Sequence, residues 1–309
     1  MNVAFISELP FVGKVPRNHN NMRTEFAWMC TLDATHFPIF EERISGIWDL
    51  IVIILPKKNI DKLIHLDLKN KYSQYSKKVA IMQEGPHWYF QDYKLNEQIW
   101  YYNTLTSVDR IYVHNNSDKV YYKGLTNHPD IRVMPSLMIE DAINKNSLIK
   151  SNERDNVIIG GNFVSWYGGF DSYIVANEIS NVVYTPSMGR KQTDEEHLVK
   201  HLPYLNWTDW ITTLSKFKYA VHLMRTHAAG TFALNCSYLG IPCIGYKGLD
   251  TQETLHPNLT VEIGNIETAK NLIKKLKNDP LFYDEQSSIT LDLYNKNYTE
   301  LKFKETFYR

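Results

Sequence analysis

The chain has 309 residues, 43% of them hydrophobic, and its 34 basic side chains balance its 34 acidic ones. This composition is that of a folded globular protein, so it excludes a disordered chain and a uniformly basic nucleic-acid coat protein. The length is enough for about two domains, because domains commonly have ~150 residues.

The sequence predicts neither a membrane span nor a metal centre. Its longest apolar run, at residues 50–55, is far shorter than the roughly 20 apolar residues that cross a bilayer. The N-terminal segment has no basic leader followed by a long apolar stretch, so we expect a cytoplasmic protein, and we expect a monomer. Cys30, Cys236 and Cys243 lie in apolar stretches without metal-site spacing, so we expect free core cysteines and no bound metal.

In the first half, short apolar runs alternate with stretches of helical periodicity. Continuous apolar runs of this length are typical of strands that are buried on both faces of a parallel sheet. We predict strands at residues 3–7, 50–55, 79–83, 110–114 and 131–134, and helices at residues 22–32, 95–105 and 117–124. A polar stretch at residues 141–156 follows, and we interpret it as a linker between domains.

The second half repeats this alternation. We predict strands at residues 157–161, 182–185, 219–224, 242–246 and 259–263, and helices at residues 170–179, 208–217, 231–239, 266–278 and from 280 onward. The whole chain is therefore predicted to be an α/β protein with two Rossmann-like, doubly wound domains, residues 1–145 and 146–309, and a central cleft. Such folds bind ligands at the carboxyl ends of their strands.

A small-residue loop before the predicted helix at residues 231–239 is the strongest candidate for a phosphate site. Its sequence, RTHAAGT, joins the end of a strand to the start of that helix. Backbone amides and the partial positive charge at a helix N-terminus bind anions, and Arg225 adds a full charge beside them. The segment therefore fits a diphosphate. The alternative is an ordinary connection in which Gly230 and Gly240 only permit tight turns.

Other segments of the second half carry groups that can hold a ligand. Residues 158–169 form a glycine-rich turn with Asn162 and Ser165 as hydrogen-bonding groups, and its spacing matches neither a dinucleotide fingerprint nor a Walker A loop. Arg190 and Lys191 follow a predicted strand, where they either bind phosphate or form solvated surface. Trp207 can stack on a nucleobase.

The segment after the predicted strand at residues 79–83 carries candidate acid and base groups. Glu84, His87 and Asp92 follow the carboxyl end of this strand. A carboxylate at the rim of a closing cleft can act as a general base when desolvation raises its pKa, and Glu84 is our first candidate for that role. The alternative is that Glu84 caps a helix or forms a structural salt bridge.

The loop after the first strand is rich in cationic side chains. Lys14, Arg17, His19 and Arg23 all lie within residues 11–26. We expect this loop to face the cleft, where it can hold a phosphate or a polyanionic acceptor, and the alternative is a solvated loop before a helix. Trp88 lies close to the candidate base in the sequence, so its aromatic ring is a further candidate for contact with an acceptor.

Two Rossmann-like halves, a phosphate-binding helix start late in the second half and a charged C-terminal helix resemble a GT-B glycosyltransferase. The resemblance implies that the second half binds a nucleotide sugar and that the first half binds the acceptor and supplies the base. In that fold a carboxylate on the helix of the phosphate loop commonly holds the ribose hydroxyls. The matching position in this sequence is Asn235, which departs from the pattern.

The sequence also resembles the DNA glucosyltransferases of T-even phages. Gly160, Gly161, Asn162 and Phe163 are similar to the Gly-Gly-x-Phe turn of that family. The loop at residues 189–192 is similar to an arginine-containing loop, and Glu84 follows its strand as the family's catalytic aspartate does. This resemblance implies an inverting transfer of a hexose or pentose from a UDP-sugar to a hydroxymethylated base, such as 5-hydroxymethylcytosine, in duplex DNA, with no obligatory cofactor.

From these patterns we predict three groups of site residues. The catalytic group consists of Glu84, Asp92 and His87, and the acceptor group of Lys14, Arg17, His19, Arg23 and Trp88. The donor group consists of Gly161, Asn162, Ser165, Arg190, Lys191, Trp207, Arg225, His227, Gly230, Thr231 and Asn235. The alternatives that stay open are a glycosyltransferase acting on a polysaccharide or glycolipid, an epimerase of the same fold, and a nonenzymatic nucleotide-sugar-binding protein.

Overall fold

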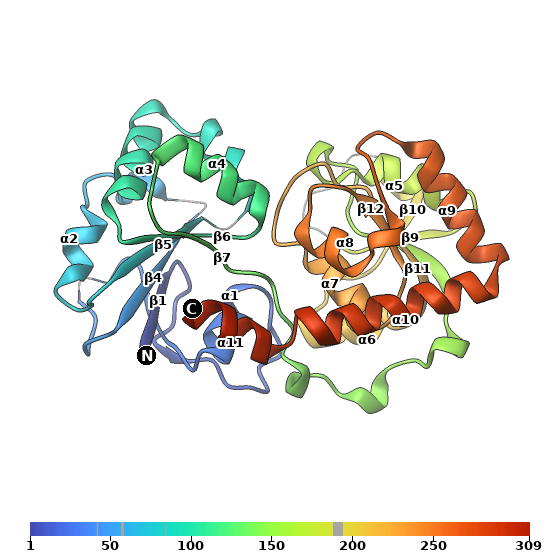
Figure 1. Cartoon of the computed structure of the whole chain (residues 1–309), viewed down its shortest axis with the longest axis horizontal. Helices are drawn as coiled ribbons and strands as arrows, with labels where there is room; N and C mark the ends of the chain where they lie inside the picture. Colours follow the sequence, from blue (N-terminus) through green and yellow to red (C-terminus); the bar gives the residue numbers. More distant parts are fainter. Residues whose placement is uncertain (42, 57–58, 84, 188–193) are drawn as a thin grey trace.

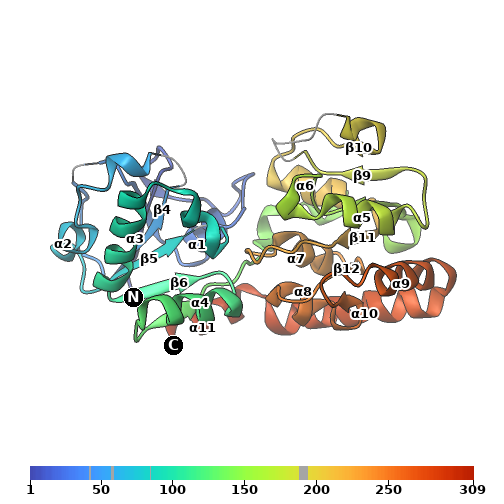
Figure 2. The same cartoon turned by 90° about the horizontal axis from the view of Figure 1, so that it is seen from above.

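The computed structural model describes residues 1–309 except residues 42, 57–58, 84 and 188–193. Three predicted site residues, Glu84, Arg190 and Lys191, therefore lie outside the described residues. The described chain forms two α/β halves that lie side by side, each built around its own twisted sheet (Figures 1 and 2).

The first sheet is formed by strands from the N-terminal half. Its order over the described residues is β2-β3-β1-β4-β5-β6-β7, and all neighbours are parallel except β2 and β3. The strands are β1 (Val3–Ser7), β2 (Gly13–Lys14), β3 (Thr35–Pro38), β4 (Leu50–Leu55), β5 (Val79–Gln83), β6 (Arg110–Val113) and β7 (Ile131–Val133). The helices of this half are α1 (Glu25–Thr31), α2 (Leu68–Ser73), α3 (Leu95–Ser107) and α4 (Asn116–Thr126).

The second sheet is wholly parallel over the described residues, in the order β10-β9-β8-β11-β12-β13. Its strands are β8 (Asp155–Ile159), β9 (Val183–Thr185), β10 (Val199–His201), β11 (Phe217–His222), β12 (Cys243–Tyr246) and β13 (Thr260–Val261). The helices that follow the linker are α5 (Gly169–Ala176), α6 (Trp207–Leu214), α7 (Thr231–Tyr238), α8 (Asp250–Leu255), α9 (Ile266–Asn278), α10 (Pro280–Asn297) and α11 (Glu300–Tyr308). The order reverses direction between β8 and β11, so the crevice between their carboxyl ends is the topological switch point, where such sheets bind ligands.

Apolar runs and side-chain caps determine where most of these elements begin and end. Strands β1, β4 and β5 are buried along their whole length, which is why continuous apolar runs form them. Asn115, Asn206 and Asn265 cap α4, α6 and α9 by accepting a hydrogen bond from a backbone N–H of the first turn. None of the described helices is both long and apolar enough to cross a membrane.

The C-terminal helix α11 packs on the first half, although its sequence belongs to the segment that we predicted as the second domain (Figure 1). Glu300 accepts hydrogen bonds from Arg17 Nη2 and Thr31 Oγ1, each at 2.6 Å. The ring of Phe307 stacks on Tyr112 of β6, with ring centroids 5.5 Å apart. The predicted boundary between residues 145 and 146 is therefore wrong for α11, because the chain crosses back to the first half after α10.

Replacing Glu300 by Gln should lower the free energy of unfolding by about 1.5–3 kcal/mol, because hydrogen bonds to a charged group are lost in a half-buried setting. Burial opposes ionisation of Glu300, but the hydrogen bonds from Arg17 and Thr31 outweigh it and lower its pKa. Glu305 is the matched control, since its carboxylate pairs with Lys302 on the surface of the same helix. Urea denaturation should show little change for Glu305→Gln. Equal losses in both variants would contradict the docking role of Glu300.

Candidate functional site

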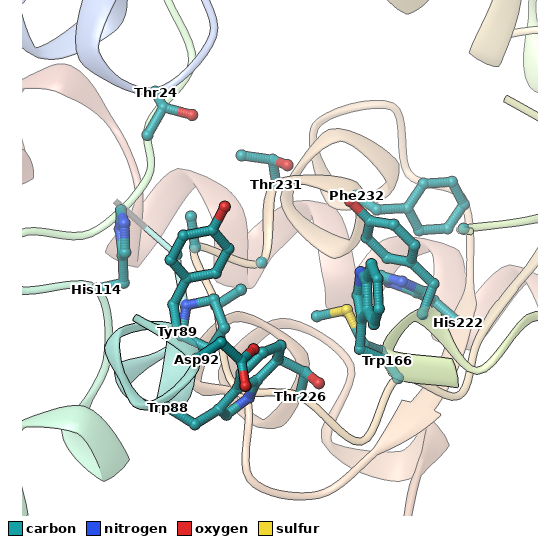
Figure 3. Close-up of a pocket in the computed structure, with 18 of the residues that line it drawn as sticks. Thr24, Trp88, Tyr89, Asp92, His114, Trp166, His222, Thr226, Thr231 and Phe232 are labelled. Atoms are coloured by element: carbon teal, nitrogen blue, oxygen red, sulfur yellow. The ribbon is translucent and has the colours of Figure 1, made fainter. Parts of the chain in front are cut away.

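A cavity of about 630 Å³ lies between the two halves. Its walls come from the loops that follow β5 and β6 in the first half and β8 and β11 in the second. Figure 3 shows side chains from both halves around it. The lining includes Trp88, Tyr89, Asp92 and His114 from the first half, and Gly160, Trp166, His222, Gly230, Thr231 and Phe232 from the second. The cleft predicted between the carboxyl ends of two sheets is therefore present.

The start of α7 forms one wall of this cavity. Gly230 precedes the helix with a φ of 65°, and a Cβ added to it would lie 1.9 Å from Thr251 Oγ1. Thr231 is the first helical residue, as the sequence predicted, and both residues line the cavity. The unpaired backbone N–H groups of a first helical turn carry partial positive charge, so this wall suits an anion.

Side chains of the first half hold the loop before α7 in place. Asn115 Nδ2 donates a hydrogen bond of 3.2 Å to the carbonyl of Ala228, and Ser136 Oγ donates one of 2.8 Å to the carbonyl of Ala229. Both alanines line the cavity. The position of the helix start therefore depends on contacts between the halves, which the sequence alone did not indicate.

Arg225 and His227, two predicted donor-binding residues, are not among the residues that line the cavity. Arg225 forms an ion pair of 2.9 Å with Asp171, and this hydrogen bond raises its pKa. The imidazole of His227 lies over Gly248, where an added Cβ would come within 2.3 Å of His227 Nε2. In this structure Arg225 is therefore paired with Asp171 and lies outside the cavity lining, and its role beside the helix start stays a prediction.

The glycine-rich turn after β8 is more tightly packed than the sequence suggested. A Cβ on Gly161 would lie 2.7 Å from Cβ of Tyr167, so this glycine allows Tyr167 to pack against the turn. Asn162 is 1% exposed, and its Oδ1 accepts a hydrogen bond from the backbone N–H of Val164. Its Nδ2 is buried without a hydrogen-bond partner among the described residues. The side chain of Ser165 lies outside the described part of the chain.

Trp207 and Asn235 are buried away from the cavity. Trp207 is 3% exposed and belongs to the apolar core that continues between the halves. The prediction that it stacks on a nucleobase is therefore wrong, because α6 turns the indole inward. Asn235 is 5% exposed on α7 and does not line the cavity, so the predicted contact with a ribose is wrong for this conformation.

Among the predicted catalytic residues, Asp92 lines the cavity and His87 does not. His87 Nδ1 lies 2.9 Å from Asp118 Oδ1, and its ring stacks on Tyr121 with centroids 4.1 Å apart. It faces a second cavity of about 290 Å³ outside the cleft. His87 therefore lies outside the cleft and its catalytic role stays a prediction, whereas Asp92 lies beside Trp88 and Tyr89 on the first-half wall (Figure 3).

Of the predicted acceptor residues, only Trp88 lines the cavity in the described chain. Lys14 pairs with Asp33, and Arg17 pairs with Asp141 and Glu300. Arg23 donates a hydrogen bond of 2.8 Å to the carbonyl of Leu205, and His19 Nδ1 lies 3.0 Å from the backbone of Asn21. The prediction that these four side chains face the cleft is wrong, because they form contacts within the first half, with the second half and with α11.

His222 is a cavity residue that the sequence analysis missed. It ends β11 at the switch point, and a Cβ on Gly160, which follows β8, would lie 2.4 Å from Cγ of its imidazole. Burial lowers the pKa of His222 to about 4, so the ring is uncharged at neutral pH. A histidine at the end of an otherwise apolar strand is the only signal that the sequence offered.

The buried histidines should make the protein less stable in acid. Burial lowers the pKa of both His222 and His256 from 6.5 to about 4. Between these values the unfolded chain binds protons that the folded chain does not, so their stabilisation is complete above pH 6.5 and is lost as the pH falls toward 4. Each histidine should contribute a slope of about 1.4 kcal/mol per pH unit. Urea unfolding at several pH values measures this slope, and a flat profile between the two pKa values would contradict it.

No group of three or more His, Cys, Asp and Glu side chains in the described residues has the arrangement of a metal site. Neither a protein-family model nor a curated protein sequence matches the chain.

Comparison with solved structures places the arrangement of the two halves in a known class. A sucrose-phosphate synthase from Thermosynechococcus elongatus superimposes with a TM-score of 0.67 at 11% identity, over 100% of this chain and 98% of that one. HepE from Anabaena, in complex with UDP and glucose, gives a TM-score of 0.69 at 10% identity, also over 100% of this chain and 98% of that one. TarM from S. aureus gives 0.62 at 10% identity, over 84% of this chain and 54% of that one. The chain has the GT-B fold.

The GT-B fold confirms the predicted α/β class with two Rossmann-like halves and a cleft between them. In this chain the cleft contains the helix start of α7, two tryptophans, Asp92 and the uncharged His222. The closer likeness to phage DNA glucosyltransferases stays a prediction.

Proposed function

We propose that this protein is a glycosyltransferase that transfers a sugar from a nucleotide donor, such as a UDP-sugar, to an acceptor hydroxyl. The observation that carries the proposal is the cavity between the halves, in which the start of α7 faces an aromatic wall with a carboxylate. The fold supports it, because solved structures with the same arrangement include HepE in complex with UDP and glucose. The proposed donor occupies the second-half wall and the acceptor the first-half wall.

The start of α7 is proposed to hold the diphosphate of the donor. Its backbone N–H groups are preorganised toward the cavity, so they stabilise the negative charge that grows on the leaving nucleoside diphosphate. The described cavity lining contains no lysine or arginine. Arg190 and Lys191 stay candidates for this charge stabilisation and lie outside the described residues.

Asp92 is proposed as the general base of an inverting reaction. Its carboxylate would take the proton from the acceptor hydroxyl while that oxygen forms a bond to the anomeric carbon and the bond to the diphosphate breaks. The proton stays on Asp92 and the electron pair leaves with the nucleoside diphosphate. Glu84, the first candidate from the sequence, stays the alternative base, and Gly85 beside it lines the cavity.

The cavity walls favour a saccharide acceptor over DNA. Trp88 of the first half and Trp166 of the second lie at a tilt of 57° with ring centroids 6.4 Å apart, and Tyr89 also lines the cavity. Aromatic walls without lysine or arginine among the described lining residues suit the apolar faces and hydroxyls of a sugar. A DNA acceptor would need cations along the phosphates, whereas Lys14 and Arg17 are paired with carboxylates.

Calorimetric titration with a panel of nucleotide sugars tests the donor site, and mass spectrometry of products tests transfer. We expect a UDP-sugar to bind and its sugar to appear on a saccharide acceptor. Transfer to DNA containing 5-hydroxymethylcytosine would restore the acceptor that the sequence predicted. Binding of a nucleotide sugar with neither transfer nor hydrolysis would favour the nonenzymatic alternative. A change in the configuration of the donor sugar would favour an epimerase. If no nucleotide sugar binds, the proposal is overturned.

A further inference from the structure

His222 occupies the switch point of the second sheet. It is the last residue of β11, and Gly160 follows the neighbouring strand β8. The backbone N–H of Gly160 donates a hydrogen bond of 2.8 Å to the carbonyl of Val221, so the two strand ends are fixed against each other. The imidazole therefore stands in the crevice where doubly wound sheets bind their ligands.

The surroundings of His222 are shaped to hold the ring in one position. A Cβ at residue 160 would lie 2.4 Å from Cγ and 2.6 Å from Cδ2 of the imidazole, so only glycine leaves room for it. Phe232, in the first turn of α7, packs edge-on with ring centroids 5.1 Å away. The ring is 8% exposed and lines the cavity next to the proposed diphosphate site.

The imidazole of His222 lacks the hydrogen bonds that the buried His256 makes. Its Nε2 is buried without a hydrogen-bond partner among the described residues. His256, which is also buried, lies within hydrogen-bond distance of the carbonyl of Ala233 and of Thr290 Oγ1. A buried polar atom without a partner is costly and is rare in folded proteins, so its presence in a ligand crevice points to a partner that arrives with the ligand.

We propose that His222 binds a hydroxyl group of the nucleotide-sugar donor at the crevice between β8 and β11. This inference rests on the proposed function and deepens it by naming a donor-recognition residue. Burial lowers the pKa of His222, so the ring stays neutral. A neutral imidazole has one N–H donor and one acceptor nitrogen, which match a hydroxyl. A phosphate, which only accepts hydrogen bonds, is better served by cations and by helix N–H groups.

Replacing His222 by Phe keeps a ring of similar shape and removes both nitrogens. We expect the dissociation constant of the donor to rise about tenfold, as for the loss of one hydrogen bond. The thermal midpoint of the free protein should stay unchanged or rise, because a buried unpaired polar atom is removed. His222→Gln restores a neutral hydrogen-bonding group and should recover part of the affinity. Calorimetry with UDP and with UDP-glucose locates the contact: a loss for both assigns it to the ribose, and a loss for UDP-glucose alone assigns it to the transferred sugar.

His256→Phe is the matched control, since its ring makes hydrogen bonds within the core. We expect it to lower the thermal midpoint and to leave donor affinity largely unchanged. Wild-type affinity for both ligands in His222→Phe would overturn the inference while leaving the proposed function intact. A fall of its thermal midpoint as large as that of His256→Phe would assign the ring to structure and would also overturn it. Failure of the wild-type protein to bind any nucleotide sugar would instead reject the proposed function.

Discussion

Replacing Asp92 by Asn should lower turnover by about two to four orders of magnitude while donor affinity persists. The amide keeps the size and hydrogen bonding of the carboxylate but cannot take the acceptor proton. Asp92 suits this test because it lines the cavity beside Trp88, on the wall opposite the start of α7. Steady-state rates, together with calorimetric titration of the donor, separate the loss of chemistry from the loss of binding.

Glu84→Gln is the companion variant that identifies the base. If Asp92 is the base, Glu84→Gln should retain most of its turnover. Loss of turnover in Glu84→Gln, with turnover retained in Asp92→Asn, would instead identify Glu84 as the base, as the sequence favoured. His87→Asn should also stay active, because His87 pairs with Asp118 outside the cleft. The anomeric configuration of the product, measured by NMR, provides an independent check, because a retained configuration would exclude a single displacement by a base-activated hydroxyl.

Replacing Gly230 by Ala should destabilise the protein by roughly 2–5 kcal/mol and abolish measurable donor binding. A left-handed backbone costs a residue with a Cβ about 1–2 kcal/mol, and overpacking adds about 1–3 kcal/mol. Both costs apply here, because φ is 65° and the new Cβ would lie 1.9 Å from Thr251 Oγ1. Relief of the clash has to move the side chain of Thr251 on α8 or the start of α7, and we expect the left-handed strain at residue 230 to move the start of α7, where we place the diphosphate.

Gly124→Ala is the control for this substitution. Gly124 lies inside α4, and a Cβ added there would meet no atom within 4 Å. Alanine in a helix interior is about 0.5–1 kcal/mol more favourable than glycine, so this variant should gain stability and keep donor binding. Urea denaturation and calorimetry compare the two variants directly. A Gly230→Ala protein that binds the donor normally would contradict the diphosphate assignment.

The sequence predicted the elements whose burial is decided locally. Strands β1, β4 and β5 and helix α9 have the predicted bounds, because each is set by an uninterrupted apolar run or by a capped amphipathic segment. The short strands β3 and β10 were missed, since their residues mix polar and apolar types. Within the candidate site, the sequence predicted the start of α7, because a glycine directly before a helix can be recognised from neighbouring residues alone.

The remaining site residues depend on contacts between distant segments. Trp207 looked available for stacking, but the side of α6 that carries it faces the core. Arg17 looked like an acceptor cation, and only the return of α11 shows that Glu300 neutralises it. The role of Gly160 in admitting the ring of His222 cannot be read from either segment, because the two residues are far apart in the sequence and meet only in the folded sheet.

The return of α11 also constrains how the two halves can move. The chain crosses between the halves after β7 and again after α10, and the two crossings run side by side (Figures 1 and 2). Tyr294, near the end of α10, donates a hydrogen bond of 3.2 Å to Glu140 in the other crossing. Because both connections lie together, sliding or twisting of one half against the other would strain both of them, whereas a hinge rotation about them would strain them least. The paired crossings would therefore bring the two cavity walls back into the same alignment after any such rotation.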